Sequence, residues 1–205
     1  MTQIFRMTHI DNLPFILNNG LCSLNSKIQD CNFILIGYQT LINDRKKTEV
    51  PINPGGTLSD YIPFYFWYKS PMLYVIYKGN DNEVYKTPQE KIVYIVSSIE
   101  KLLDLNTKFV FTDRHAHLKY ANFYNSKENL NKLNWNYIKS NDWSRIYGPE
   151  IRELKQAECL VYRQMPIEAF LGIAVMNEKM KIAAEKIIND STVRLIVKIK
   201  PEFYF

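Results

Sequence analysis

A single acidic residue stands at the start of an apolar segment in the last third of the chain. Glu158 directly precedes residues 159–162 (Cys-Leu-Val-Tyr), a run typical of a buried β-strand. Burying a carboxylate is costly unless the group finds partners, so Glu158 lies either at a sheet edge or in a functional site. In a site, such a carboxylate can stabilise developing positive charge or accept a proton.

Two earlier segments carry groups that suit an anionic ligand. Residues 8–14 (Thr-His-Ile-Asp-Asn-Leu-Pro) run from a strand end into a helix N-terminus, where free N–H groups can bind an anion or a ribose hydroxyl. The alternative there is a capped helix beside a surface histidine. Arg45 precedes a Pro-Gly-Gly loop and offers a rigid fork of donors to phosphate or ribose. A basic run in a loop, as at 44–47, is more often a solvated face.

The most aromatic part of the chain is residues 61–68, Tyr-Ile-Pro-Phe-Tyr-Phe-Trp-Tyr. Alternate side chains of such a strand face the core, and core packing is the default for most of these rings. Tyr65 or a neighbouring ring can instead stack on a flat ligand. Lys69 and Met72 lie just beyond this strand and are better placed to meet a ligand.

The polar segment before Glu158 holds further candidates. His115 and His117 are two residues apart, but no matching cysteine or acid cluster accompanies them, so we predict no metal site. Trp143 and Arg145 are placed to lie against a substrate. The Gly-x-Gly-x-x-Gly motif, the Gly-Lys-Ser/Thr phosphate loop and the Gly-x-Ser-x-Gly elbow are all absent. A dinucleotide bound here would therefore not use a Rossmann unit.

Composition indicates an ordinary globular protein with one domain over residues 1–205, since 46% of the residues are hydrophobic and 23% are charged. The net charge of +5 is compatible with a polyanionic partner without requiring one. Cys22, Cys31 and Cys159 form no C-x-x-C pair and predict reduced thiols in a cytoplasmic protein. Neither a signal segment nor a membrane-spanning apolar run is found, so we expect no membrane association.

Short strands and helices alternate in mixed order, which predicts an α+β class. Strands are expected at 4–7, 61–68, 92–96, 109–112, 158–163, 172–176 and 193–199, largely antiparallel in the C-terminal half. Asp11 is the expected N-cap of a helix that stops at Gly20, and Ser70-Pro71 opens another that stops at Gly79. Pro63 predicts an edge or bent strand, and residues 22–50 are expected to be irregular. Further helical segments are expected at 98–105, 166–171 and 178–188.

Several separated blocks occur in one order along nearly the whole chain. They are THIDNLPFIL (8–17), VPxxPGGxLxDYIPFYF (50–66), SPMLYxIY (70–77), KFVFTDRH (108–115) and KQAECLVY (155–162). Together they resemble the DarT family of bacterial toxins, which ADP-ribosylate single-stranded DNA. The resemblance implies the ADP-ribosyltransferase fold, a split and mostly antiparallel β-sheet core that holds NAD in the cleft between its halves.

The resemblance also implies roles for individual residues. Glu158 and Arg45 are the expected catalytic pair, because cleavage of the nicotinamide–ribose bond builds positive charge that a carboxylate can stabilise. The target base must be unpaired to react, so the DNA is single-stranded or flipped. NAD, the co-substrate, is expected on His9, Ile10, Asp11, Asn12, Arg45 and Tyr65. DNA is expected on Lys69, Met72, Arg114, His115, Trp143 and Arg145.

Several alternatives remain at this stage. Thymine and guanine are both possible acceptor bases, and RNA or protein is the alternative target. A nucleic-acid-binding module without catalysis is a further alternative, against which the presence of both Glu158 and Arg45 argues. The resemblance also implies a partner, an antitoxin with ADP-ribosyl hydrolase activity (DarG-like).

Overall fold

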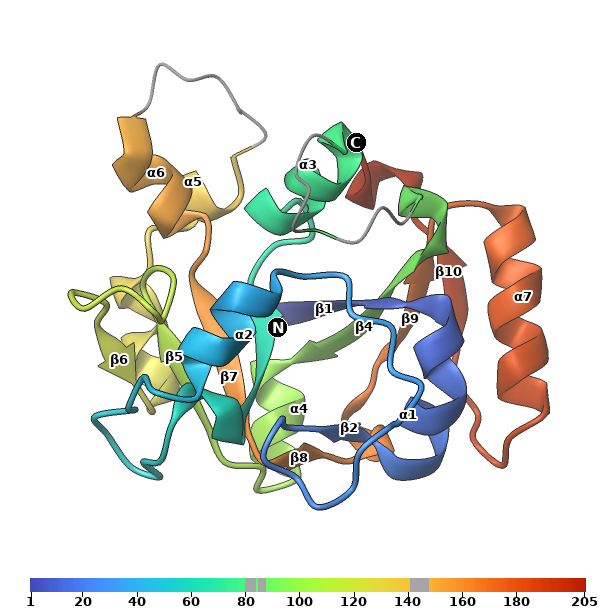
Figure 1. The fold of residues 1–205 in the computed structure, drawn as a ribbon, viewed down its shortest axis with the longest axis horizontal. Coiled ribbons are helices and arrows are strands. Elements are labelled where there is room, and N and C mark those ends of the chain that lie inside the picture. Colours follow the sequence, from blue (N-terminus) through green and yellow to red (C-terminus); the bar gives the residue numbers. More distant parts are fainter. Residues whose placement is uncertain (80–83, 85–87, 141–147) are drawn as a thin grey trace.

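The computed structural model of the protein describes residues 1–79, 84, 88–140 and 148–205, and one eight-stranded sheet organises this part of the chain (Figure 1). Neighbouring strands are antiparallel, except for the two at one edge, at 172–175 and 197–199. The predicted α+β class and mostly antiparallel sheet are thereby confirmed. The strand order is β10 (Val197–Ile199), β9 (Gly172–Val175), β4 (Ile92–Ser98), β1 (Gln3–His9), β3 (Tyr61–Tyr65), β7 (Glu158–Tyr162), β5 (Phe109–Thr112) and β6 (Phe123–Tyr124).

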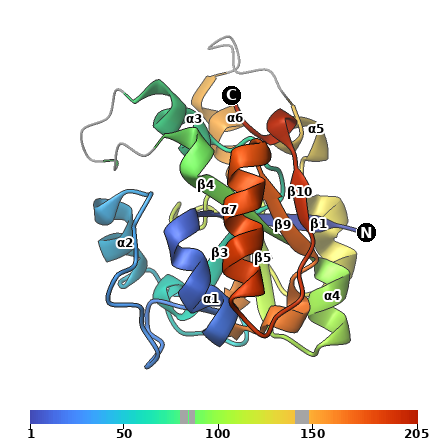
Figure 2. The same cartoon turned by 90° about the vertical axis from the view of Figure 1, so that its right-hand side faces the viewer.

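Helices cover both faces of the sheet (Figures 1 and 2). On one face, Leu13 and Met180 pack around Val93 of β4. On the other, Leu73 packs in a cluster with Phe5 of β1. Strands β2 (Leu21–Cys22) and β8 (Gln164–Met165) form a separate pair. The described α-helices are α1 (Leu13–Asn19), α2 (Gln39–Arg45), α3 (Pro71–Lys78), α4 (Ile99–Asp104), α5 (Trp135–Ile138), α6 (Gly148–Leu154) and α7 (Glu178–Asn189).

The sheet opens between β1 and β3. These two strands share a single register pair, Phe5 with Tyr65, and diverge from it, so that a wedge forms between them. Pro63 lies in this wedge, where its carbonyl oxygen accepts a hydrogen bond from the Arg6 side chain. Of the two alternatives that Pro63 predicted, an edge or a bent strand, the edge strand is wrong, because β3 lies between β1 and β7. Proline is tolerated there because β1 does not pair with it and no ladder partner needs its missing N–H.

Several local predictions are confirmed by the caps of α1 and α3. Ser70 Oγ accepts a hydrogen bond from the backbone N–H of Leu73, and α3 ends at Gly79 with φ of 60°. Gly20 ends α1 with φ of 73°, and a Cβ there would lie 2.4 Å from the carbonyl oxygen of Met165. Both glycines adopt left-handed backbone that other residues rarely accept.

Three local predictions are wrong. Asp11 is not a cap; its backbone N–H instead donates to His9 Nδ1 at 3.2 Å, and a 3-10 turn (Ile10–Asn12) precedes α1. Helix α2 forms inside residues 22–50, which were expected to be irregular. A seven-residue helix is marginal alone, so contacts distant in sequence must decide that it forms. The last strand begins at Val197 rather than at 193.

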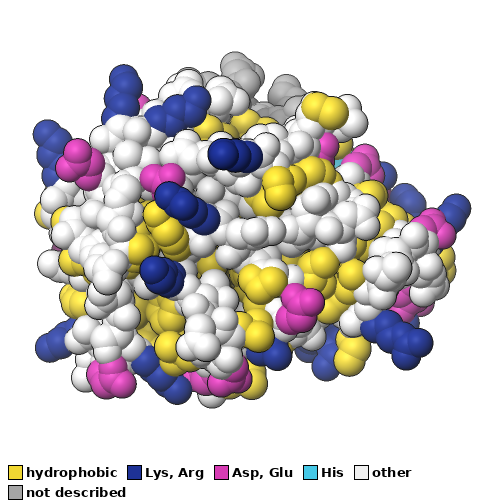
Figure 3. Space-filling model, turned by 90° about the horizontal axis from the view of Figure 1, so that it is seen from below, with side chains coloured by type: hydrophobic (Ala, Val, Ile, Leu, Met, Phe, Trp, Pro, Cys, Tyr) yellow, Lys and Arg dark blue, Asp and Glu magenta, His cyan; other side chains and the backbone are white. Residues whose placement is uncertain are grey.

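Two further properties concern the distribution of surface charge and the length of the helices. On the face in Figure 3, lysine and arginine side chains are scattered among acidic and apolar ones, so positive charge is not gathered into one patch there. Across the described part of the chain, no helix combines the length and the apolarity that a membrane span requires.

Candidate active site

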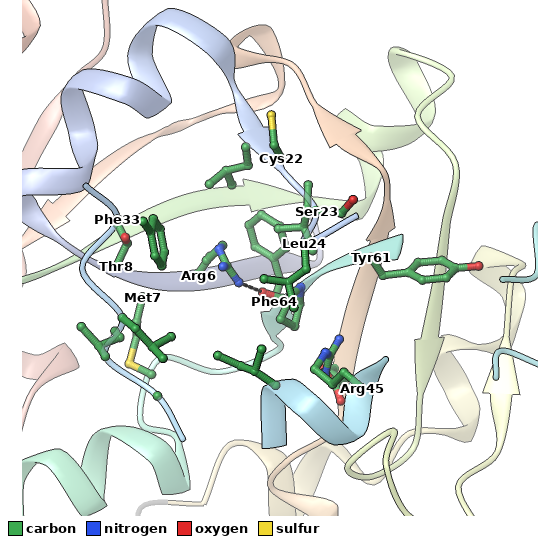
Figure 4. A pocket seen from close by; sticks show the side chains of 18 of the residues that line it. Arg6, Met7, Thr8, Cys22, Ser23, Leu24, Phe33, Arg45, Tyr61 and Phe64 are labelled. Carbon is green, nitrogen blue, oxygen red and sulfur yellow. Dashed lines mark hydrogen bonds and ion pairs between the residues drawn. The ribbon is translucent and has the colours of Figure 1, made fainter. Parts of the chain in front are cut away.

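A cavity of about 300 Å³ opens at the wedge between β1 and β3 (Figure 4). The loop from Gly20 to Tyr38 and helix α2 form much of its wall, and Met72 of α3 also lines it. Figure 4 shows Arg6 and Arg45 reaching this region from β1 and α2. Its chemistry-bearing lining residues include Arg6, Arg45, Tyr65, His115 and Glu158.

Glu158 and Arg45 meet in this cavity although they are 113 residues apart in sequence. Arg45 Nη1 lies 3.4 Å from Glu158 Oε2, and Arg45 Nη2 donates to the carbonyl oxygen of Leu58 at 3.4 Å. Only 9% of Arg45 and 5% of Glu158 are exposed. An ion pair removed from water to this degree interacts strongly, and each partner is destabilised if the other is lost.

Strand β7 and the loop after β5 hold the carboxylate in place. The register pairs Glu158 with Tyr65 of β3, which fixes the side of β7 on which the carboxylate lies. Glu158 Oε1 accepts a hydrogen bond from the backbone N–H of Ala116 at 2.9 Å, and the Glu158 N–H donates to Thr112 Oγ1 at 3.4 Å. Glu158 therefore lies at the cavity with a fixed orientation and not at an exposed sheet edge.

Arg6 is a cavity residue that sequence reasoning missed. Its Nη1 donates to the Pro63 carbonyl at 2.9 Å, while its buried Nε has no hydrogen-bond partner within the described residues. Burial, and secondarily the charge of Arg45, lower the pKa of Arg6 to about 10, so it is still protonated at neutral pH. The available signal was a cation in the middle of the predicted strand at 4–7.

The segment His9–Asn12, expected to bind NAD, lies beside the cavity and not in its lining. The Asn12 amide binds the loop: its Nδ2 donates to the Ile34 carbonyl at 2.9 Å and its Oδ1 accepts from the Ile34 N–H at 2.8 Å. Ile10 is in the apolar core, and Asp11 is exposed. His9 is buried, and burial lowers its pKa. In this arrangement the segment positions the loop that covers the cavity.

Tyr65 and Met72, both predicted to meet a ligand, line the cavity. Burial raises the pKa of Tyr65, and so does the nearby Glu158 charge, so the phenol is neutral at neutral pH. Tyr65 is the residue of β3 that pairs both with Phe5 of β1 and with Glu158 of β7.

His115 lines the cavity, whereas Arg114 is bound to the loop around it. Burial lowers the pKa of His115, with Glu158 opposing and Arg45 reinforcing this effect. The Arg114 guanidinium lies 3.4 Å from Asp113 Oδ1, 3.9 Å from Glu153 Oε2 and over the Tyr120 ring. The other predicted DNA contacts, Trp143 and Arg145, lie outside the described residues. No cluster of three or more His, Cys, Asp or Glu side chains suited to a metal ion occurs in the described ranges.

The cavity has the features of a site for an anionic ligand with flat rings. Arg6 Nε and Ser23 Oγ are buried lining atoms without hydrogen-bond partners in the described part of the chain. Buried polar atoms normally have hydrogen-bond partners. A ligand that accepts a hydrogen bond from Arg6 Nε and forms another with Ser23 Oγ therefore fits this cavity. Apolar side chains such as Leu24 and Phe33 complete the wall. The arrangement combines ligand binding with a carboxylate that can stabilise positive charge.

Comparisons with known proteins identify the family. The chain matches the family described as ssDNA thymidine ADP-ribosyltransferase, DarT, over residues 5–205. A DNA ADP-ribosyl transferase of Escherichia coli O127:H6 is 36% identical over 203 residues, which cover 98% of this chain and 93% of that protein. A Thermosipho africanus fusion of DNA ADP-ribosyl transferase and DNA ADP-ribosyl glycohydrolase is 26% identical over 99% of this chain, which spans 49% of the fusion.

Solved structures agree with this match. The structure of Thermus sp. 2.9 DarT in complex with ADP-ribosylated ssDNA has a TM-score of 0.91 and 37% identity, covering 100% of this chain and 96% of that one. The same Thermus protein in complex with NAD⁺ has a TM-score of 0.87 and 36% identity, covering 100% and 98%. The expected ADP-ribosyltransferase fold is thereby confirmed. The chain belongs to the DarT family, NAD-dependent ADP-ribosyltransferases that modify thymidine in single-stranded DNA.

Proposed function

We propose that the wedge cavity is where this protein performs its family's reaction, with Glu158 as the catalytic carboxylate and Arg45 as its partner. The single observation that carries this proposal is the buried contact between Arg45 Nη1 and Glu158 Oε2 at a ligand-sized cavity. Removing the charges of Arg45 and Glu158 from water costs free energy. Buried charge pairs of this kind occur preferentially at functional sites.

The chemistry gives Glu158 two tasks. The reaction breaks the bond between nicotinamide and ribose C1′ and joins C1′ to a ring nitrogen of thymine. The electron pair of the broken bond leaves with nicotinamide, so positive charge develops on the ribose, as in glycoside cleavage. Glu158 stabilises this charge. The thymine nitrogen loses a proton as it attacks, and Glu158 is the described group best placed at the cavity to accept it.

Arg6 and Arg45 supply guanidinium donors for the diphosphate of NAD. Both line the cavity, and the Arg6 Nε lacks a partner within the described residues. A guanidinium binds phosphate through charge-assisted hydrogen bonds. Tyr65 offers a ring for stacking, and the loop held by Asn12 forms much of the cavity wall. NAD bound by the Thermus relative supports this assignment of the co-substrate.

His115 and Met72 are the described residues that we propose to contact the target thymidine, because both line the cavity that holds Glu158. Arg114 was expected to contact DNA. Its contacts with Asp113 and Glu153 instead support a role in holding the loop at 113–122 against α6. The ssDNA bound by the Thermus relative supports the single-stranded substrate.

The function is tested with four single-stranded oligonucleotides, each lacking one base, incubated with wild-type protein and NAD. Mass spectrometry is expected to show a gain of one ADP-ribose on the three that contain thymidine and none on the fourth. Modification of the thymidine-free oligonucleotide, or of none of the four, would overturn the proposal. Duplex DNA of the same sequence serves as the control, because pairing hides the ring nitrogen.

Arg6→Met is expected to raise the KM for NAD about tenfold or more and to change kcat little. A hydrogen bond to phosphate is made equally in the ground state and the transition state, so its loss weakens binding without slowing chemistry. Initial rates at saturating oligonucleotide and varied NAD measure both constants.

Arg6→Lys serves as the matched variant, because it keeps the charge and loses the forked donors. An intermediate KM is expected for it. A fall in kcat at unchanged KM for Arg6→Met would show that Arg6 does not act through NAD binding. A thermal melt of each variant detects any loss of folding through the missing contact with Pro63.

We further propose that an antitoxin with ADP-ribosyl hydrolase activity reverses this modification. The Thermosipho relative supports this, since it joins a transferase and a DNA ADP-ribosyl glycohydrolase in one chain. Such an enzyme is expected to return the modified oligonucleotide to its original mass. We also propose that the protein acts in the cytoplasm, where NAD and single-stranded DNA occur together and thiols stay reduced.

A further inference from the structure

The outer face of α3 and the ring of Phe205 form a cluster of aromatic and cationic side chains that the chemistry above does not use. We call it the α3 platform. Figure 1 shows the C-terminal end of the chain beside α3. The platform consists of Lys69, Tyr74, Tyr77, Lys78 and Phe205.

Three rings of the platform pack against one another. Tyr77 and Phe205 stack with ring centroids 5.6 Å apart and an interplanar angle of 25°. Tyr74 meets the Phe205 ring edge-on at 5.3 Å. Lys78 Nζ lies 5.4 Å from both tyrosine centroids, and Lys69 Nζ lies 5.3 Å from the Phe205 centroid. Two ammonium groups therefore lie over a set of packed rings.

Tyr77 is the most exposed ring of the platform, and Lys69 and Lys78 give the platform its positive groups. Tyr77 is a large aromatic residue and is 49% exposed, whereas Leu73 and Ile76 of the same helix are buried. The segment from Lys69 to Gly79 contains no aspartate or glutamate. Within the described residues, neither Lys69 nor Lys78 takes part in a salt bridge.

The platform is continuous with the active site through α3. Met72, in the first turn of this helix, lines the cavity that holds Glu158. Tyr77 follows five residues later, which is about 8 Å along a helix axis. A strand of nucleic acid with its target base in the cavity, beyond Met72, can therefore continue along α3 to the platform.

We propose that the α3 platform binds nucleotides that flank the target thymidine in single-stranded DNA. The inference rests on the proposed active site at Glu158. Aromatic side chains stack on bases of any sequence, and lysines beside them neutralise the phosphates. The two lysine ammonium groups over the packed rings favour a polyanion with flat bases over a basic protein surface as the occupant. The platform would therefore raise affinity for long single strands and add little for a short one.

The test compares two substrates and one double variant, Tyr77→Ala with Lys78→Ala. One oligonucleotide of about 16 nucleotides carries a single central thymidine, and the other is its central segment of about 4 nucleotides. For the long substrate, kcat/KM is expected to fall roughly tenfold in the variant, because one stacked base and one phosphate contact are lost. For the short substrate it should stay within about twofold of wild type, since its kcat/KM does not depend on the platform. The salt dependence of binding to the long strand should weaken by about 0.7 in log–log slope for the lost lysine.

The matched control is Ile182→Ala with Lys186→Ala on α7, which removes one large exposed side chain and one lysine from the face opposite α3. It should behave as wild type on both substrates. Equal losses on long and short substrates, or no loss on either, would overturn the inference, as would a variant that binds DNA normally and loses binding to the antitoxin. Failure of the active-site proposal is distinguishable, because then wild type itself would modify neither substrate.

Discussion

Replacing Glu158 with glutamine is expected to slow ADP-ribose transfer to a thymidine-containing oligonucleotide by about a thousandfold or more. Glutamine has nearly the same shape and keeps an oxygen that can accept the hydrogen bond from the Ala116 N–H. It has no negative charge to place beside the ribose and no basic oxygen to accept the proton from thymine. Single-turnover rates at saturating NAD, followed by mass spectrometry, measure the loss.

The matched control for this prediction is Glu168→Gln, which makes the same chemical change at an exposed position. It should react at the wild-type rate. Glu158→Gln should still fold and bind NAD, with a lowered melting temperature because the buried Arg45 loses its anionic partner, so rates are compared well below that temperature. Retention of more than a tenth of the wild-type rate would contradict the catalytic assignment of Glu158.

Removal of Arg45 is expected to damage both rate and stability. Arg45→Met leaves the Glu158 carboxylate buried without its cation and leaves the Leu58 carbonyl without the Arg45 donor, so the free energy of unfolding should fall by several kcal/mol. Transfer should slow by about a hundredfold or more. Arg45→Lys should recover much of the stability and little of the rate, because lysine keeps the charge without the fork that makes both contacts.

A double variant separates these two effects. Arg45→Met combined with Glu158→Gln should be more stable than Arg45→Met alone, since the neutral amide does not need a cation. Its rate should be no lower than that of Glu158→Gln, because residues acting as a unit do not contribute additively. Chemical unfolding curves and the oligonucleotide assay measure both quantities. Fully additive losses of stability and rate would show that Arg45 and Glu158 act independently.

The local elements were predictable where backbone chemistry decides them. Ser70 at the start of α3 and the glycines Gly20 and Gly79 at helix ends were identified from residue type, because capping and left-handed backbone depend on neighbours in sequence. Helix α2 was missed because seven residues have little helical stability of their own. Arg45 at its end contacts Leu58 and Glu158, and these contacts exist only in the folded chain.

The interior position of β3 was mispredicted for a similar reason. Proline argues against a central strand when every backbone N–H has a ladder partner. In this fold β1 diverges from β3 after a single register pair, and the Arg6 side chain binds the Pro63 carbonyl in the gap. That divergence also creates the cavity. Arg6 was overlooked and Pro63 was misinterpreted for the same reason. The positions of both residues depend on the divergence of β1 from β3, which the sequence does not reveal.

By itself the sequence determined the family, the α+β class and the candidate pair Glu158 and Arg45, because these depend on ordered blocks of residues and on the cost of burying a carboxylate. Only the tertiary structure decided which candidates share a cavity. In the folded protein Arg6 lines the cavity, and Asn12 hydrogen bonds to the loop that lines it. Arg114 contacts the carboxylates of Asp113 and Glu153. The physical reason is that a side chain's role depends on its partners, and partners 50 or more residues away, such as Pro63 for Arg6 and Glu158 for Arg45, are set by strand pairing and packing.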